Sequence, residues 1–354
     1  MSQGVGIIEL GTPGALAPWA ATLDTLAAEA RAPVFASSAW LSAWWRSLEP
    51  GARIYLLVDE QPEGVVGMLP VALLERRAHP SLPLRIPYVG LAGSGRGAAD
   101  HLRPLTRSPE SAARLLTAVA GLDGGRSLLL EGVTAEVREL LASTIPGRVV
   151  REVPCPRIDL TCVAGPEQLW RQKRRSNLRR TYRRCKDLGF DRRWVRLDGS
   201  NLHHLDELQR LHERLWRSRG RPGLIDDVRR VFLADVATRL DGHGSAWLQV
   251  IGDASHAVAV QLAFEFGASM CSYAVGWDPA LRRLGLGVQL EAGGIERAFE
   301  RGLERYDFLR GTEAHKLELG GVPTNDVSWF APRGPHGPLL AVRESILARR
   351  DAWA

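Results

Sequence analysis

One stretch in the second half of the chain combines a strand, a glycine turn and a helix. The apolar run 269–277 predicts a strand, and the spacing R-x-x-G-x-G follows it at Arg282, Gly285 and Gly287. Residues 287–301 then show the periodicity of an amphipathic helix. Glycines let backbone N–H groups approach a phosphate, and a helix start adds the positive end of its dipole. This order therefore predicts a cradle for a phosphate or diphosphate.

A β meander precedes this cradle. The apolar runs 247–251, 257–266 and 269–277 are separated by short turns, at GDASH and at Gly267–Ala268. Short turns between β-rich runs are typical of antiparallel hairpins. After the helix, a short strand is expected at 306–309. The pattern predicts an α+β fold with a mixed sheet, in which an antiparallel meander is followed by a β-α-β crossover.

Length and composition predict a globular protein of two domains. The chain has 354 residues, of which 45% are hydrophobic and 24% charged, and a domain usually holds about 100–200 residues. We expect the domains at 1–160 and 161–354. No apolar run approaches the roughly 20 residues that span a bilayer, and the N-terminal segment lacks a basic leader. We therefore expect no membrane insertion and a cytoplasmic location.

Metal and serine-nucleophile chemistry find no support in the sequence. The four cysteines form no C-x-x-C pair, and no G-x-S-x-G elbow is present. His203, His204 and His212 lack ligand spacing and are expected to decorate a helix at 203–218. The predictions are that no metal is bound and that the thiols are reduced.

A strongly basic segment lies at 171–186. It holds nine Lys or Arg and no acidic residue, whereas the net charge of the whole chain is only +6. Leu178, Tyr182 and Cys185 form a narrow stripe through which such a helix could dock. Three interpretations stay open: a solvated helix face, a site for an anionic small molecule or a carrier's phosphate, and a nucleic-acid contact. Zinc-finger spacing and RNP-like aromatic motifs are absent, which disfavours DNA binding.

The first half predicts elements of a separate domain. Expected are a helix at 35–48, a hairpin of 54–58 with 65–74, a helix at 110–120 and a strand at 126–132. Trp40, Trp44 and Leu48 share one helix face and are expected in the core. A loop rich in Gly and Pro ends at Asp100, a candidate substrate contact because loops carry sites. A C-terminal helix at 338–350 is expected to pack across the second half.

Three motifs resemble one branch of the GNAT acyltransferases. They are F-x-S-x-x-W-L at Phe35–Leu41, KRRSNLRR at Lys173–Arg180, and the block from GWDP to D-F-L-x-G-x-E-x-x-K at Gly276–Lys316. This branch is known as cellulose-biosynthesis-type or "BioF2-like" acetyltransferases and is related to the Fem peptidyltransferases. The resemblance implies two GNAT-like halves in tandem, an acceptor site in the cleft between them, and transfer of an acyl or aminoacyl group to an amine.

The resemblance assigns the glycine turn to the diphosphate of an acyl-coenzyme A. The expected donor contacts are Arg282, Leu284, Gly285, Leu286 and Gly287. Many family members have serine–proline where this chain has Leu284–Gly285, so the turn is closer to an ordinary coenzyme-A loop. This departure favours acyl-CoA, with acetyl-CoA preferred, over aminoacyl-tRNA as donor.

Three residues after the last strand are candidates for catalysis. Amine attack on an acyl carbonyl requires positioning, a proton acceptor and stabilisation of an oxyanion. Glu313 and His315 are candidate general bases, and His315 has the better-matched pKa. Lys316 is a candidate partner for developing negative charge or a donor phosphate. Arg175 and Arg179 of the basic segment join Asp100 as candidate substrate contacts.

The sequence thus predicts an N-acyltransferase that moves an acyl group from acyl-CoA to an amine of a small metabolite or sugar precursor. One alternative is a Fem-like enzyme with aminoacyl-tRNA as donor. Another is a non-catalytic pair of GNAT domains that serves as a binding module. The first half has no R-x-x-G-x-G, and its nearest match, Gly93–Gly97, lies in a loop. We expect that half to be inactive toward the donor.

Overall fold

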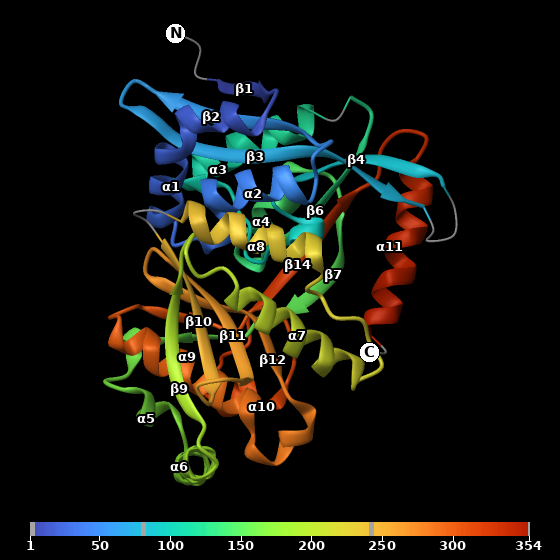
Figure 1. Cartoon of the computed structure of the whole chain (residues 1–354). Helices are drawn as coiled ribbons and strands as arrows, with labels where there is room; N and C mark the ends of the chain where they lie inside the picture. Colours follow the sequence, from blue (N-terminus) through green and yellow to red (C-terminus); the bar gives the residue numbers. More distant parts are fainter. Residues whose placement is uncertain (1–3, 79–82, 123, 241–243, 353–354) are drawn as a thin grey trace. The chain divides into compact units, whose positions relative to one another are not determined.

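The chain divides into two compact units, which Figure 1 shows in sequence colours. The computed structural model describes residues 4–78, 83–122, 124–240 and 244–352. The first unit comprises Met1–Val153 with Asn325–Ala354, and the second comprises Pro154–Thr324. The sequence predicted 1–160 and 161–354. The difference arises because strand β14 (Asn325–Ala331) pairs with β6 (Ser127–Thr134) and so returns the chain to the first sheet.

The sheet of the first unit is a meander followed by a crossover. Its first four strands run antiparallel in the order β1-β2-β3-β4, with β5 on β3; β6 then joins β4 in parallel. Helix α3 (Pro109–Gly121) makes that crossover, and β14 and β7 complete the sheet. The remaining strands are β1 (Val5–Leu10), β2 (Arg53–Gln61), β3 (Gly64–Arg77), β4 (Arg85–Leu91), β5 (Leu105–Thr106) and β7 (Arg148–Pro154).

Two tryptophans anchor helix α2 in the core of the first unit. The hydroxyl of Ser37 accepts a hydrogen bond from the Trp40 amide at 3.1 Å and so caps the helix. Trp40, Trp44 and Leu48 are buried, which confirms their predicted place in the core. The helices of this unit besides α3 are α1 (Ala20–Glu29), α2 (Ser38–Ser47), α4 (Arg138–Thr144) and α11 (Gly337–Ala352).

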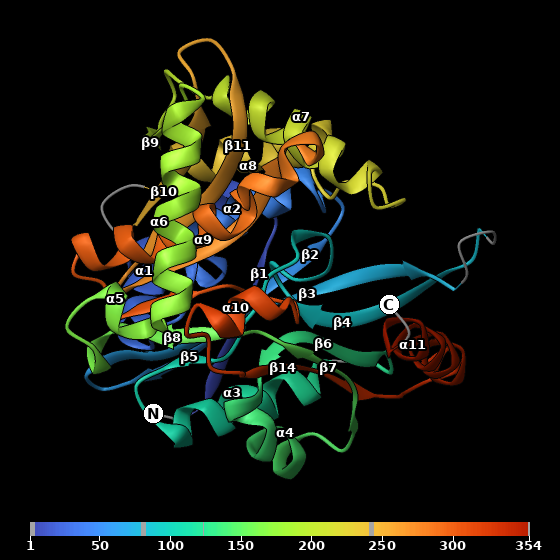
Figure 2. The same ribbon diagram turned by 90° about the horizontal axis from the view of Figure 1, so that it is seen from below.

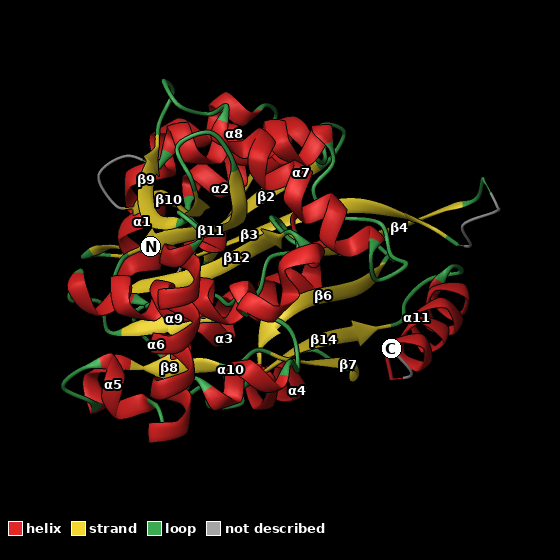
Figure 3. Ribbon diagram, turned by 60° about the horizontal axis from the view of Figure 1, so that its bottom comes forward, coloured by secondary structure: helices red, strands yellow, loops and turns green. Residues whose placement is uncertain are grey.

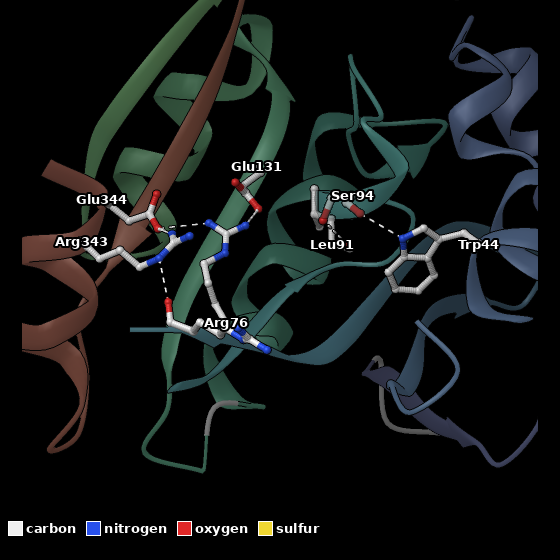
Figure 4. A network of polar contacts seen from close by, with 8 residues as sticks. Trp44, Arg76, Leu91, Ser94, Glu131, Arg343 and Glu344 are labelled. Atoms are coloured by element: carbon white, nitrogen blue, oxygen red, sulfur yellow. Dashed lines mark hydrogen bonds and ion pairs between the residues drawn. The ribbon is translucent and has the colours of Figure 1, made fainter. Parts of the chain in front are cut away.

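The C-terminal helix α11 belongs to the first unit, and the expectation that it packs across the second half was wrong. Glu344 of α11 accepts a hydrogen bond from Arg76 of β3 at 3.1 Å, and Arg76 also pairs with Glu131 of β6 (Figure 4). Arg343 donates to the Arg77 carbonyl at 2.9 Å. Because Arg76 is largely buried, its two carboxylate partners offset the cost of removing its charge from water.

The second unit repeats the order of the first. Strands β9, β10, β11 and β12 form an antiparallel meander, and β13 joins β12 in parallel after helix α9 (Leu286–Glu300) (Figure 3). This confirms the predicted mixed fold. The strands are β8 (Arg157–Asp159), β9 (Asp191–Leu197), β10 (Gly244–Gly252), β11 (Ala257–Phe266), β12 (Ser269–Trp277) and β13 (Arg305–Asp307).

The basic segment forms helix α6 (Gln172–Asp187), which lies beside α9 (Figure 2). Leu178 and Cys185 are buried against the core and Tyr182 is half-buried there, so the predicted docking stripe is confirmed. The other helices of this unit are α5 (Pro166–Leu169), α7 (His204–Arg217), α8 (Asp227–Arg239) and α10 (Ala314–Glu318). Among the described residues, no helix combines the length and apolarity needed to cross a membrane.

Helix α9 rests on a buried polar network. The Glu291 carboxylate accepts hydrogen bonds from Tyr306 at 2.8 Å and Ser272 at 3.0 Å. A Cβ on Gly293 would lie 2.0 Å from Gln249 Oε1, and one on Gly294 would lie 2.3 Å from the Tyr306 hydroxyl. Although glycine weakens a helix by about 1 kcal/mol relative to alanine, these two positions let the backbone approach polar side chains of the sheet.

Gly276 permits an equally close contact on α7. A Cβ at this position of β12 would lie 2.4 Å from the backbone nitrogen of His212 and 2.7 Å from the Leu211 carbonyl carbon. Both atoms belong to a helix backbone, which cannot rotate away as a side chain can. The contact fixes α7 against the C-terminal half of β12.

We predict that Gly276→Ala lowers the free energy of unfolding by about 1–3 kcal/mol, the usual cost of overpacking a core. The measurement is the urea midpoint of the purified protein. Gly199→Ala is the control, because no atom lies within 4 Å of the Cβ it would add. Equal midpoints for the two variants would contradict the close packing of α7 on β12.

Candidate active site of the second unit

The pairing between β12 and β13 ends early and leaves an open strand edge. Only Ser269–Cys271 of β12 pair with Arg305–Asp307. Beyond this point the chain turns to another neighbour, since Phe308 donates to the Pro156 carbonyl at 3.0 Å and Gly311 to that of Pro154 at 2.9 Å. The C-terminal half of β12 therefore has no strand partner on this side.

The open edge exposes backbone groups of Val275. Asp278 donates to the Val258 carbonyl of β11 at 2.9 Å, and hydrogen-bonding residues alternate along an antiparallel pair. Val275, three residues earlier, therefore directs its N–H and C=O away from β11. Tyr273 is an extra residue on β12, because Ser272 and Ala274 face consecutive residues of β11. The bulge changes which side chains face α9 along this edge.

The glycine turn forms the start of helix α9, as predicted. Gly285 has φ +63° and ψ 36°, a left-handed conformation that favours glycine, and it directly precedes the helix. The Gln289 amide is bonded to the Gly285 carbonyl at 3.1 Å, so the N–H groups of Leu286, Gly287 and Val288 have no acceptor within the helix. Such a helix start attracts anions.

The surroundings of the turn suit a phosphate. A Cβ on Gly287 would lie 3.2 Å from Trp277 Nε1, so the backbone and the indole are already close. Arg282 and Arg283 are exposed and have no acidic partner among the described residues. Leu284 and Leu286 are buried beneath the turn, so only their backbone could meet a ligand.

The three candidate catalytic residues lie on or next to the short helix α10. The Lys316 ammonium is buried and donates to the carbonyls of Arg310 at 2.8 Å and Phe308 at 3.2 Å. It also lies 3.1 Å from the Glu313 carboxylate. These contacts use the ammonium to fix residues 308–313, the segment that diverges from β12.

His315 has the properties of a neutral base. Burial lowers its pKa, against the raising effect of Glu313, and the charges of Lys316, Arg174 and Arg219 lower it further. The imidazole is therefore uncharged at neutral pH and able to accept a proton. The pKa of Glu313 is also lowered, because Lys316 outweighs the opposing effect of burial. Glu313 is thus a weak base.

Helix α6 brings its positive charge to the glycine turn. Thr181 Cγ2 lies 3.9 Å from where a Cβ on Gly285 would stand. At the other end of α6, Arg174 pairs with Glu318 of α10. Arg175 is half-buried and Arg179 is exposed, and neither side chain has an acidic partner among the described residues.

A pocket of ≈ 280 Å³ lies beside the C-terminal half of α6. Gln289 links it to the glycine turn, because its amide donates to the Leu284 carbonyl at 2.7 Å and lies 3.4 Å from the Cys185 sulfur. The pocket lining is partly aromatic and partly charged: Tyr182, Cys185, Lys186, Phe190, Asp191, Arg192, Ile251 and Gln289.

Asp100, the third candidate substrate contact, lies in the first unit and is only 1% exposed. Its neighbours 99–102 run along β6: Leu102 donates to the Gly132 carbonyl at 2.7 Å, and Thr134 donates to that of Leu102 at 3.1 Å. In this unit the edge of β6 next to β4 is therefore covered by the chain itself. The equivalent gap in the second unit is the open edge of β12.

Tryptophans occupy the glycine loop of the first unit. Trp40 Nε1 donates to the Gly93 carbonyl at 3.3 Å and Trp44 Nε1 to that of Ser94 at 3.0 Å, the latter visible in Figure 4. A Cβ on Gly97 would lie 2.9 Å from Trp44 Cδ1. The indoles hold the loop through its carbonyls, whereas the turn before α9 presents N–H groups.

Sequence reasoning missed three features of the site. His212 is buried instead of decorating α7, and its ring contacts Val275. Its place next to Leu211 and Leu215 in the apolar stripe of α7 was a usable signal. The charge of Arg219, which acts on His315, and the bulge at Tyr273 depend on tertiary packing and left no sequence signal.

Comparison with known proteins gives one family match. The family model described as acetyltransferase (GNAT) domain matches residues 172–317, a segment that contains the meander, the glycine turn and α10 up to Leu317. No curated protein sequence matches the chain.

Solved structures share the fold along nearly the whole chain. FemX is 11% identical with a TM-score of 0.59, and covers 95% of this chain and 100% of its own. The C-terminal domain of a protein described as lysylphosphatidylglycerol synthetase from Agrobacterium fabrum is 13% identical with a TM-score of 0.55, covering 92% and 96%. L-PGS from Bacillus licheniformis is 12% identical with a TM-score of 0.55 and the same coverage. The fold and the family match identify residues 172–317 as a GNAT acetyltransferase domain, and the chain as an acyltransferase of this type.

Proposed function

We propose that the protein is an N-acyltransferase that transfers an acyl group, preferably acetyl, from acyl-CoA to an amine of a small metabolite or sugar precursor. The observation that carries this proposal is the joint presence, at one end of β12, of an open strand edge and a glycine turn with free N–H groups. A thioester donor has an extended amide-bearing arm suited to the edge and a diphosphate suited to the turn. The sequence motifs favour the cellulose-biosynthesis or "BioF2-like" branch.

The residues of the site divide the reaction between them. The helix start at Gly287, with Arg282, binds the diphosphate. The Val275 N–H hydrogen-bonds the donor at the open edge, and Lys316 positions the segment 308–313 opposite. The neutral amine attacks the thioester carbonyl, the C–S bond breaks, and His315 accepts the amine proton, directly or through water. The products are the amide and the free thiol.

The first unit has a scaffolding role in this proposal. Its groove is filled by residues 99–102 and its glycine loop by Trp40 and Trp44, which supports the expected lack of donor binding. Asp100 is buried, which favours a structural role over substrate contact. We also propose a cytoplasmic location, which the free thiols of all four cysteines favour.

A donor-binding variant tests the glycine turn. Acetyl-CoA at about 100 times its Kd should stabilise the wild type by about 2.7 kcal/mol, seen as a raised thermal midpoint. Gly287→Glu should abolish this shift, because its carboxylate would stand at the phosphate position and its Cβ would crowd Trp277. Arg282→Ala should weaken binding by roughly tenfold through loss of one charged contact. Arg283→Ala is the control, and an equal loss in this neighbour would argue against a specific role of Arg282.

The pH dependence of kcat/KM tests the base. The pKa of Glu313 lies below 4.5 and that of His315 below 6.5, so an acid limb between these values belongs to His315. Activity should fall as pH falls, because protonated His315 accepts no proton. Glu313→Gln should move the limb to lower pH, since the Glu313 charge raises the His315 pKa. His315→Gln should lower kcat by about 10²–10⁴; a full acid limb in this variant would exclude His315 as base.

The charge of α6 favours a second candidate, an aminoacyl-tRNA donor. Arg175 and Arg179 belong to a helix next to the glycine turn, where their cations lack acidic partners among the described residues. RNA binding would then depend steeply on salt. Neutralising both arginines should lower the slope of log K against log[salt] by about 1.5, or roughly 0.7–0.9 per phosphate contact. The matched control is Arg46→Ala with Arg148→Ala, two exposed cations of the first unit. Salt-independent binding, or equal slopes for the two double variants, would reject this donor.

A further inference from the structure

His212 stands between the donor strand and the loop that joins α7 to α8. Its Nδ1 lies 2.8 Å from the Val275 carbonyl oxygen, and its Nε2 lies 3.1 Å from the Leu224 amide nitrogen. The side chain is 4% exposed. A Cβ on Gly276 would lie 2.4 Å from the His212 backbone, and one on Gly223 would lie 3.3 Å from its ring. Strand, helix and loop therefore meet at this ring.

The two contacts define the protonation state of the imidazole. The Leu224 N–H can only donate, so Nε2 must offer its lone pair and the ring proton must be on Nδ1, where it is donated to Val275. The neutral ring satisfies both partners. A second proton on Nε2 would remove the acceptor of the Leu224 N–H and place two donors face to face.

The loop held by His212 reaches the reacting region. It spans residues 218–226, and the guanidinium of Arg219 stacks on the Trp216 ring at 5.3 Å from its centroid. The charge of Arg219 also lowers the pKa of His315, the proposed base, which places the loop within electrostatic range of α10. On the other side, the Val275 carbonyl belongs to the open edge where the donor is proposed to lie.

We propose that His212 is a positioning residue that fastens the 218–226 loop to the open edge of β12, and that its protonation in acid releases the loop. The structural part of this proposal stands on the contacts of His212 alone, and its consequence for catalysis rests on the proposed function. His212 does not reach the reacting atoms, since both ring nitrogens are engaged. It sets the position of the Val275 backbone on one side and of Arg219 on the other.

The electrostatic surroundings of His212 determine the direction of the pH effect. Burial is the main cause of its lowered pKa; the hydrogen bond to Val275 opposes it, and the charges of Arg229 from α8 and Arg219 from the loop add to it. The released ring regains an ordinary pKa of 6.5. The neutral, fastened state is thus complete above about pH 6.5 and is lost as pH falls toward the lower pKa of the folded state.

Hydrogen exchange in the 218–226 loop tests the proposal without reference to any substrate. After correction for the intrinsic rate, opening of the Leu224 amide should increase by up to about tenfold for each pH unit below 6.5 in the wild type. In His212→Gln, whose amide oxygen can accept from Leu224 but does not titrate, the protection should be independent of pH. In His212→Phe the amide should be unprotected at every pH. The α9 segment 286–300 reports global unfolding and should not change.

The outcomes separate this inference from the proposed reaction. Constant protection of the wild-type loop through the acid range, or the same acid loss in His212→Gln, would overturn the fastening role, even if His212→Phe fails to fold. If acetyl-CoA is turned over, His212→Gln should change the donor KM more than kcat and should keep the His315 acid limb. If no acyl-CoA is turned over, the exchange result still decides whether His212 fastens the loop.

Discussion

Three residue pairs join β12 to β13, and the site of the second unit depends on the point where they stop. Leu309 has φ +54°, a strained value for leucine, and its amide bonds to the Asp307 carboxylate at 2.8 Å. Lys316 then binds the carbonyls of the same segment. Together these contacts turn the chain toward residues 154–156, so that β12 keeps an unpaired edge. An exposed edge is ordinarily a liability, and here it supplies backbone donors and acceptors for a ligand.

The two units show how one topology gives an open groove and a filled one. Both contain a four-stranded meander, a crossover helix and a parallel strand. In the first unit the chain after β4 returns along β6, where Leu102 bridges Val133. Gly132, with φ +67°, accommodates the close approach of the Ala99 carbonyl. In the second unit, the helix begins directly after the turn, so its first N–H groups stay available.

Burial and charge are balanced differently around the two key cations. Arg76 is surrounded by Glu131, Glu344 and the Tyr88 ring and ties α11 to the sheet. The α6 cations are mostly solvated and gather beside a helix start that is itself positive. Like charges at such spacing repel, which an anionic donor would relieve. This electrostatic excess is compatible with a coenzyme-A diphosphate and with RNA, and salt dependence distinguishes them.

The sequence alone determined the local elements of this protein and the order in which they occur. Apolar periodicity located β10 to β12 and α9, glycine spacing located the turn at Gly285, and the stripe of Leu178 and Cys185 located the buried face of α6. These signals are local, because strand alternation, helix periodicity and left-handed turns depend on near neighbours. Only the tertiary structure decided that Lys316 is buried in carbonyls, that α11 belongs to the first unit, and that His212 bridges a strand and a loop. These outcomes depend on where distant segments meet, and a side chain's chemistry depends on that surrounding as much as on its identity.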